Sequence, residues 1–198
     1  MPPKIIIFDL MDTVVVDPFF HVFPQYFQMP LEQLFKLKED ANWPKFEIGE
    51  IEEADYFTNF FRADTGIKLA QPDHLKAAIF NAYRYIPGME ELLSHLHSQG
   101  YPLWIHSNYS HWFEEVRTRL QLDRYFSGYA VSYQLKIRKP APQAYHAALT
   151  LMGYPAEQGL FIDDREANIV AAQQVGLATS LFTNVENLRR DLASQGIT

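Results

Sequence analysis

Lys4-Ile5-Ile6-Ile7-Phe8-Asp9 is an apolar run that ends in a carboxylate. The run is short, continuous and rich in β-branched side chains, which is typical of a strand buried on both faces of a parallel sheet. Ligands of such sheets bind beyond the carboxyl ends of the strands. The segment therefore predicts a buried strand that delivers Asp9 to a ligand site.

The same kind of run returns in the second half of the chain, where it alternates with amphipathic segments. Further strands are expected at 102–106, 129–131, 160–162 and 179–182. Helices are expected from Met89 to Leu96 and over 142–152, 168–175 and 186–193. The first three of these helices are followed by glycines that provide C-terminal stops: Gly100, Gly153 and Gly176. This alternation predicts an α/β fold with a doubly wound parallel sheet.

Residues 17–86 interrupt the alternation with a helical segment. Apolar side chains recur there at helical spacing, as in Leu31, Leu34 and Phe35. Asp17-Pro18 and Pro87-Gly88 punctuate its two ends. We therefore expect a core domain formed by residues 1–16 and 87–198, with a helical cap domain of residues 17–86 inserted into it.

The composition restricts the classes of function. Of the residues, 47% are hydrophobic and 21% are charged, as in an ordinary globular domain. The net charge of −7 argues against a nucleic-acid partner, and no apolar run approaches the roughly 20 residues that span a bilayer. The N-terminus resembles neither a secretory leader nor a transit peptide, so we expect a cytoplasmic protein, or a plastid protein if the chain is a processed form.

Polar side chains follow the ends of the predicted strands. In chain order they are Asp9, Ser107 with Asn108, Lys139, and Asp163 with Asp164. Each alone has a common structural role, because Asp and Ser frequently cap turns and helices. Together, carboxylates at one edge repel one another unless a cation neutralises them, and in a chain without cysteine an all-oxygen site suits Mg²⁺. A metal, a lysine and a carboxylate nucleophile serve phosphoryl transfer through an aspartyl-phosphate.

These residues form four ordered motifs that resemble the haloacid dehalogenase (HAD) superfamily. The motifs are Phe8-Asp9-Leu10-Met11-Asp12-Thr13, Ile105-His106-Ser107-Asn108, Lys139-Pro140-Ala141-Pro142 and Phe161-Ile162-Asp163-Asp164. The resemblance implies a Rossmann-like core with a helical cap between the first two motifs. It further implies that Asp9 is the nucleophile and a metal ligand, and that Ser107 and Lys139 bind phosphate, with Asn108 beside them. Asp164 would bind the metal directly, and Asp163 indirectly.

The first motif departs from the superfamily pattern. Phosphatases of this superfamily normally carry a second Asp, the general acid and base, two residues after the nucleophile. Here that position is Met11, which cannot transfer a proton, although its backbone carbonyl can still bind the metal. The next residue, Asp12, has two interpretations that the sequence leaves open. It either supplies the missing proton or only stabilises the turn.

A longer segment is similar to a branch of this superfamily, the flavin mononucleotide (FMN) hydrolases of plant plastids. It runs from Phe8 to Phe19 and includes Met11-Asp12 and Asp17-Pro18-Phe19. The resemblance implies FMN as the favoured small phosphate ester. The cap is rich in aromatic residues that suit a flat ring, although most of them are expected to fill the cap interior. We expect His106 to be a packed core residue and Arg165 to be a solvated residue at a helix start.

Two other functions compete with a magnesium-dependent phosphatase. A 2-haloacid dehalogenase also uses an aspartate nucleophile and lacks an Asp at the Met11 position, but it needs no metal. A catalytically weak protein that binds a phosphorylated ligand or a protein partner is the second alternative. The retained Asp9, Lys139 and Asp163-Asp164 count against it, whereas Met11 counts for it. The sequence predicts no oligomeric state.

Overall fold

Five parallel strands form a sheet in the computed structural model, which describes residues 3–197. They are β1 (Ile5–Phe8), β2 (Leu103–Ser107), β3 (Gly128–Val131), β4 (Gly159–Asp163) and β5 (Ala178–Leu181). Their order in the sheet is β3-β2-β1-β4-β5, and every neighbouring pair is parallel. The predicted Rossmann-like α/β fold is confirmed. The chain reverses its direction of winding between β1 and β4, which is where such sheets bind ligands.

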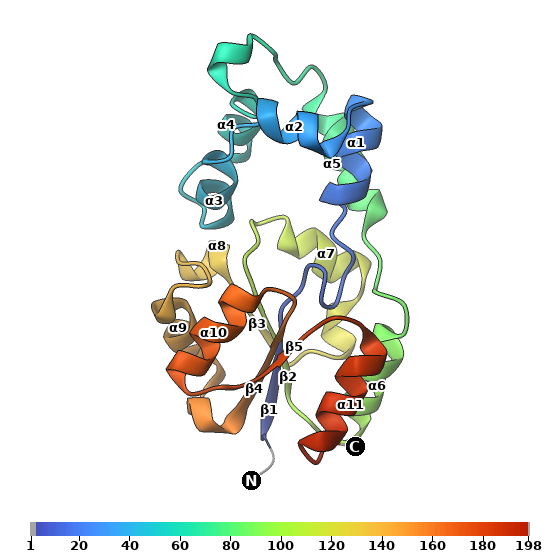
Figure 1. The fold of residues 1–198 in the computed structure, drawn as a ribbon, viewed down its shortest axis with the longest axis vertical. Coiled ribbons are helices and arrows are strands. Elements are labelled where there is room, and N and C mark those ends of the chain that lie inside the picture. The colour runs from blue at the N-terminus through green and yellow to red at the C-terminus, as the bar shows by residue number, and fades with distance from the viewer. Residues whose placement is uncertain (1–2, 198) are drawn as a thin grey trace.

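Helices cover both faces of this sheet (Figure 1). They are α6 (Met89–Ser98), α7 (Phe113–Arg119), α8 (Ser132–Leu135), α9 (Pro142–Met152), α10 (Glu166–Val175) and α11 (Val185–Ser194). Short 3₁₀ turns add η2 (Leu122–Arg124) and η3 (Ala156–Gln158). Strand β1 alternates between the two faces, because Ile5 and Ile7 pack in the cluster of α9 and α10, while Ile6 and Phe8 pack in the larger cluster opposite.

The predicted elements of the sheet and its helices agree with the structure, except where the apolar pattern in the sequence is too short to indicate a helix. Helix α9 has the predicted bounds and ends at Gly153, whose φ of 75° is left-handed. Helix α7 was not predicted. It buries only Phe113 and Val116, and one pair of apolar residues is too short a stripe to show helical periodicity.

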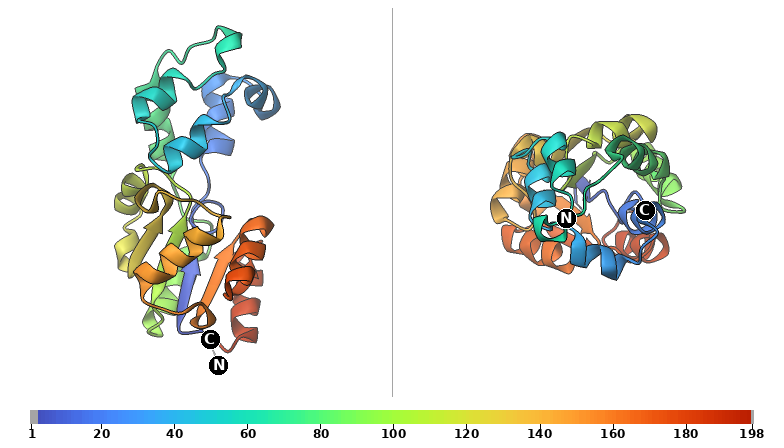
Figure 2. Two further views of the ribbon diagram at one scale, coloured as in Figure 1. Left: turned by 90° about the vertical axis from the view of Figure 1, so that its left-hand side faces the viewer. Right: turned by 90° about the horizontal axis from the view of Figure 1, so that it is seen from above.

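Of the described helices between β1 and β2, the first five lie above the carboxyl edge of the sheet (Figures 1 and 2). They are α1 (Phe19–Phe27), α2 (Leu31–Leu37), α3 (Asn42–Glu47), α4 (Glu53–Thr58) and α5 (Pro72–Ala82), with the 3₁₀ turn η1 (Ala63–Thr65). Aromatic rings fill their interior, as expected, and those of Phe46 and Tyr56 stack with centroids 4.8 Å apart. We propose from this arrangement that residues 17–86 are the cap domain, and that the described residues up to 16 and from 87 onward are the core domain.

Polar contacts fix the cap against the core. The Nε atom of Arg138 lies 2.8 Å from the carboxylate of Glu47, at the end of α3. The hydroxyl of Ser132 donates to the Glu47 carbonyl at 2.8 Å. The carboxylate of Glu53 accepts a hydrogen bond from the indole of Trp112. The space between cap and core is therefore bounded by side chains of both domains.

Candidate active site

The carboxyl edge of the sheet brings three predicted carboxylates together. Asp9 follows β1, Asp163 ends β4, and Asp164 is the next residue. Each offers one oxygen, and these oxygens lie within 4.8 Å of one another. Asp9 and Asp163 are buried, and Asp164 is half-buried. The winding of the sheet explains the convergence, because β1 and β4 are neighbours although 150 residues separate their sequences.

The ammonium of Lys139 is the counter-ion of this cluster. It is fully buried and donates to Asp9 Oδ1, Asp163 Oδ2 and the carbonyl of His106, at 2.7 Å each. Burial alone would lower the pKa of Lys139, but the charges of Asp163 and Asp9 raise it above its ordinary value. All three N–H donors are used within the protein, so Lys139 orients the Asp9 carboxylate. Its contact with phosphate stays a prediction.

The two adjacent carboxylates at the end of β4 have different surroundings. Asp163 is fully buried and accepts from the Lys139 ammonium, the Arg165 backbone at 2.8 Å and the Asn168 amide at 2.9 and 3.0 Å. Asp164 has a buried oxygen, Oδ1, that finds no hydrogen-bond partner within residues 3–197. A buried acceptor without a donor is costly unless a ligand satisfies it.

The charges of the cluster fit a divalent cation. Three carboxylates face one ammonium, which leaves an excess of negative charge. Burial raises the pKa of Asp9, Lys139 opposes that rise, and Asp163 adds to it. A hard cation on the free oxygen of Asp164 would offset both the repulsion and the unsatisfied acceptor.

The other residues of the second and third motifs support Lys139. The Asn108 side chain donates to the Lys139 carbonyl and accepts from its N–H, at 2.8 Å each. The predicted substrate contact of Asn108 stays a prediction. Ser107 is buried at the end of β2, and its contact with phosphate stays a prediction. His106 is packed in the core as expected, with burial lowering its pKa to about 3.

The loop after β1 holds Asp12 in a turn. Asp12 has a left-handed φ of 55°, and its N–H donates to the Val15 carbonyl at 2.7 Å. Its Oδ1 accepts from the backbone N–H of Asp17 at 2.9 Å. This geometry favours the interpretation of Asp12 as a residue that stabilises the turn, and its acid role stays a prediction.

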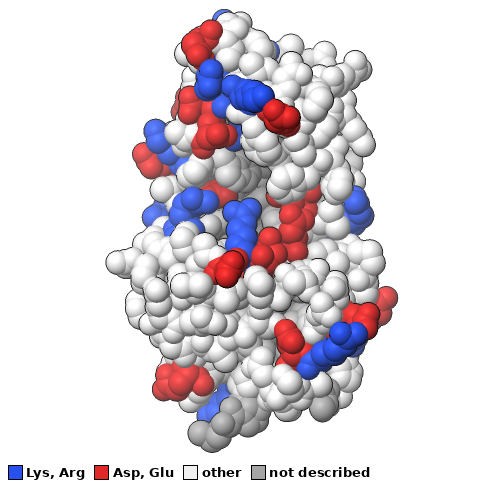
Figure 3. Space-filling view, viewed as in Figure 1, with Lys and Arg blue, Asp and Glu red and all other residues white. Residues whose placement is uncertain are grey.

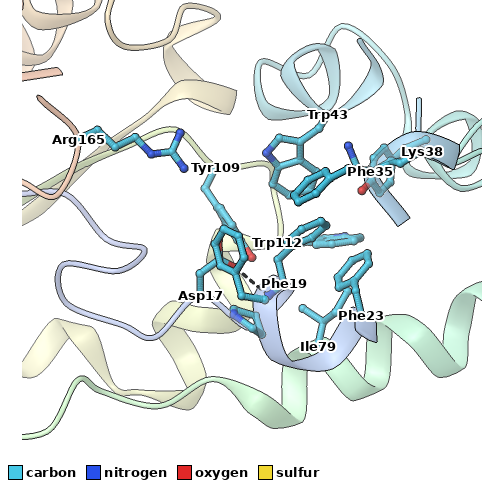
Figure 4. A pocket seen from close by; sticks show the side chains of 13 residues that line it. Asp17, Phe19, Phe23, Phe35, Lys38, Trp43, Ile79, Tyr109, Trp112 and Arg165 are labelled. Atoms are coloured by element: carbon cyan, nitrogen blue, oxygen red, sulfur yellow. Dashed lines mark hydrogen bonds between the residues drawn. The ribbon is translucent and has the colours of Figure 1, made fainter. Parts of the chain in front are cut away.

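An aromatic pocket of about 290 Å³ lies beside the carboxylates, in the hollow between cap and core (Figures 3 and 4). The pocket begins at the strand ends, since Tyr109 and Arg165 line it and directly follow Asn108 and Asp164. Its other lining residues are Asp17, Pro18, Phe19, Phe20, Phe23, Phe35, Lys38, Trp43, Tyr56, Ile79 and Trp112. Sequence reasoning missed Tyr109 and Trp112, because they belong to the core part of the chain and only the aromatic residues of the cap were considered for a flat ring.

One cation faces this aromatic wall from the cap. The Lys38 side chain is only 8% exposed, and among the described residues 3–197 its ammonium makes a single long polar contact, 3.4 Å, to the exposed carboxylate of Asp40. An ammonium carries three donors, so Lys38 has donors to offer a ligand in the pocket.

Within residues 3–197, no helix has the length and apolar character needed to cross a membrane.

Comparisons with known proteins agree with this geometry. A family model described as haloacid dehalogenase-like hydrolase matches residues 3–176. Flavin mononucleotide hydrolase 1 of Arabidopsis thaliana, a protein named as chloroplastic, is 34% identical over 193 residues. The match covers 98% of this chain and 78% of that relative.

Two solved structures share the fold. A HAD family enzyme of Bacteroides thetaiotaomicron, in complex with magnesium and inorganic phosphate, matches with a TM-score of 0.71 and 21% identity over 94% of this chain and 98% of that one. The L-2-haloacid dehalogenase of Xanthobacter autotrophicus matches with a TM-score of 0.70 and 16% identity, over 99% of this chain and 84% of that one. The fold alone therefore does not choose between the two reactions.

Proposed function

The chain belongs to the haloacid dehalogenase-like hydrolases, and from this premise we propose that it is a magnesium-dependent phosphatase of small phosphate monoesters, with FMN as its favoured substrate. The observation that carries the proposal is the buried Asp9 carboxylate, held by Lys139 beside the unsatisfied oxygen of Asp164. This arrangement supplies a fixed carboxylate nucleophile next to an anionic site that needs a cation.

The residues of the chain account for the two halves of the reaction. Lys139 holds one oxygen of Asp9 and so aims the carboxylate at phosphorus. Attack by Asp9 forms an aspartyl-phosphate, and the ester oxygen leaves with the electron pair of its bond to phosphorus. Water then cleaves the aspartyl-phosphate, which releases inorganic phosphate and restores Asp9.

Asp9, Asp164 and the carbonyl of Met11 would hold the metal, with Asp163 fixing their surroundings from behind. Bound there, Mg²⁺ neutralises negative charge on the carboxylates and on the phosphoryl oxygens. The residues fit this ion, because the acidic cluster contains a buried oxygen without a donor and every candidate ligand is oxygen.

Asp164→Asn should weaken magnesium binding more than Asp163→Asn does. The Asp164 oxygen is free for a cation, whereas both Asp163 oxygens are already engaged by protein donors. Calorimetric titration of each purified variant with Mg²⁺ gives the two dissociation constants, and thermal unfolding monitors the fold. Equal weakening, or a larger effect at Asp163, would contradict this division of roles.

The pocket supports a substrate with a flat, partly polar ring. Its walls are largely aromatic, and stacking favours planar groups over the faces of sugars. An apolar chain in the same space would leave the buried Lys38 ammonium without an acceptor, at a cost in desolvation. The isoalloxazine ring of FMN offers both a large flat face and an edge with carbonyl acceptors. The name of the Arabidopsis relative points to the same substrate.

FMN should be hydrolysed with a higher kcat/KM than hexose or triose phosphates. Lys38→Met should raise KM for FMN about tenfold, as expected for one lost charged hydrogen bond, and should leave hydrolysis of p-nitrophenyl phosphate unchanged. The matched control is Lys36→Met, because Lys36 lies two residues before Lys38, on helix α2, but its side chain is 70% exposed. A sugar phosphate that exceeds FMN tenfold in kcat/KM would overturn the substrate assignment.

A further inference from the structure

The phosphatase proposed above lacks a proton donor at the usual position. The alcohol released from an alkyl phosphate is a poor leaving group unless its oxygen is protonated as the bond breaks. Met11 has no proton to give, and Asp12, which accepts from the N–H of Asp17 to close the turn, is not among the residues that line the pocket. A donor must therefore come from another residue that reaches the space between the nucleophile and the pocket.

Asp17 lines the pocket, and the charge of Asp164 acts on its carboxyl group. It is the last residue before Pro18 and helix α1, at the junction of the core loop and the cap. Its backbone N–H is fixed by Asp12, and its own Oδ1 accepts from the N–H of Phe19 at 2.9 Å. The Asp17 backbone and one carboxyl oxygen are thus held, and within residues 3–197 the other oxygen, Oδ2, is left to carry a proton. Figure 4 shows Asp17 in the pocket wall, close to Phe19.

We propose that Asp17 is the general acid and base of this enzyme, acting in place of the residue missing at Met11; the inference rests on the proposed function. As Asp9 bonds to phosphorus and the ester bond breaks, the leaving oxygen takes the Asp17 proton and departs as an alcohol. The Asp17 carboxylate then accepts a proton from the water whose oxygen attacks the aspartyl-phosphate. Inorganic phosphate leaves, and both carboxyl groups return to their starting states.

The surroundings of Asp17 support the required protonation. Burial raises the pKa of Asp17 to about 6, the hydrogen bond from Phe19 opposes that rise, and the charge of Asp12 adds to it. Two further charges act on Asp17 from the end of β4, where the Arg165 guanidinium lowers the pKa and the Asp164 carboxylate raises it. The charge of Asp17 acts on the hydroxyls of Tyr56, Tyr83 and Tyr109, whose own pKa values are raised, so these hydroxyls stay neutral.

The test is a comparison of leaving groups in Asp17→Asn. The amide oxygen can still accept from Phe19, so the loop is preserved while the exchangeable carboxyl proton is lost. We expect kcat/KM for FMN to fall by about 100-fold or more, while that for p-nitrophenyl phosphate, whose phenolate leaves without protonation, changes by less than about threefold. The alkaline limb of the wild-type FMN profile, in which activity falls as pH rises through the pKa of Asp17, should also disappear.

Asp12→Asn is the matched variant, because its amide oxygen can still accept from Asp17. The inference is overturned if Asp17→Asn slows both substrates equally or neither, or if Asp12→Asn alone shows the selective loss. Assays of the wild-type enzyme with Mg²⁺ distinguish a failure of this inference from a failure of the proposed function. If the wild-type enzyme hydrolyses neither substrate, the phosphatase proposal is refuted. If it hydrolyses p-nitrophenyl phosphate but not FMN, only the substrate assignment is refuted. In that second case the comparison is made with glycerol phosphate as the alkyl ester.

Discussion

Asp9→Asn should lower phosphate release at least about 1,000-fold while leaving the fold intact, because loss of a nucleophile is among the largest effects that one substitution has on an enzyme. The amide has almost the same shape as the carboxylate, but it attacks phosphorus poorly and is a weak ligand for Mg²⁺. Its oxygen can still accept the hydrogen bond from Lys139, which in the wild type spans 2.7 Å. The variant should therefore keep the position of Lys139 while losing the chemistry.

Phosphate release from FMN and from p-nitrophenyl phosphate measures this loss with two leaving groups. Circular dichroism and thermal unfolding establish that the variant is folded. Asp64→Asn is the matched control, because that carboxylate lies in the cap with a side chain that is 70% exposed. An Asp9→Asn protein that retains most of the wild-type activity would show that Asp9 is not the nucleophile.

Lys139→Met should destabilise the protein by about 3–5 kcal/mol, which is the usual cost of leaving a buried charge without its partner. The substitution removes the only ammonium that contacts Asp9 and Asp163 within the described part of the chain. For a domain of this size, that loss corresponds to a fall in Tm of roughly 6 to 20 °C. Lys36→Met, at an exposed lysine of α2, should change Tm little.

The loss of stability caused by Lys139→Met, which we call the deficit, should also depend on pH. Burial already raises the pKa of Asp9, and Lys139 opposes that rise, so removing the ammonium raises the pKa further. A carboxyl group whose pKa is higher in the folded state binds more protons there than in the unfolded chain, so stability falls as pH rises between the two pKa values. The deficit should therefore be smaller near about pH 5 than near about pH 8. Thermal unfolding of both proteins at the two pH values measures it, and an equal deficit would contradict the ion-pair account.

Much of the site could be predicted because its chemistry is encoded locally. Asp9 and Asp163 sit directly at the ends of apolar runs, and the alternation of strands and helices predicts a parallel sheet whose carboxyl ends meet at one edge. The strand order that makes β1 and β4 neighbours was not predicted. The pairing of Asn168 with Asp163 was missed, although the two lie only five residues apart. Asn is common in the first turn of helices, so nothing in the sequence distinguished it from a capping residue.

The pocket was harder to predict because cap and core both contribute to it. The aromatic residues of the cap were recognised, but the sequence could not separate those that fill its interior from those that face a ligand. Phe60 is buried among other rings, whereas Phe19 lines the pocket. Asp17 was interpreted as punctuation before Pro18 and as part of the segment similar to FMN hydrolases, without a role of its own. Its place beside the catalytic edge depends on how the loop after β1 folds back through Asp12, a contact that no periodicity encodes.

Whether the purified protein is a magnesium-dependent phosphatase is decided by its release of inorganic phosphate from FMN, measured with Mg²⁺, after chelation, and after Mg²⁺ is restored. We expect release with Mg²⁺, its loss on chelation and its recovery on addition of the metal, because the Asp9, Asp163 and Asp164 carboxylates need a cation before a phosphate can approach. No release from FMN or any other phosphate ester in the presence of Mg²⁺, together with metal-independent release of halide from a 2-haloacid, would contradict it.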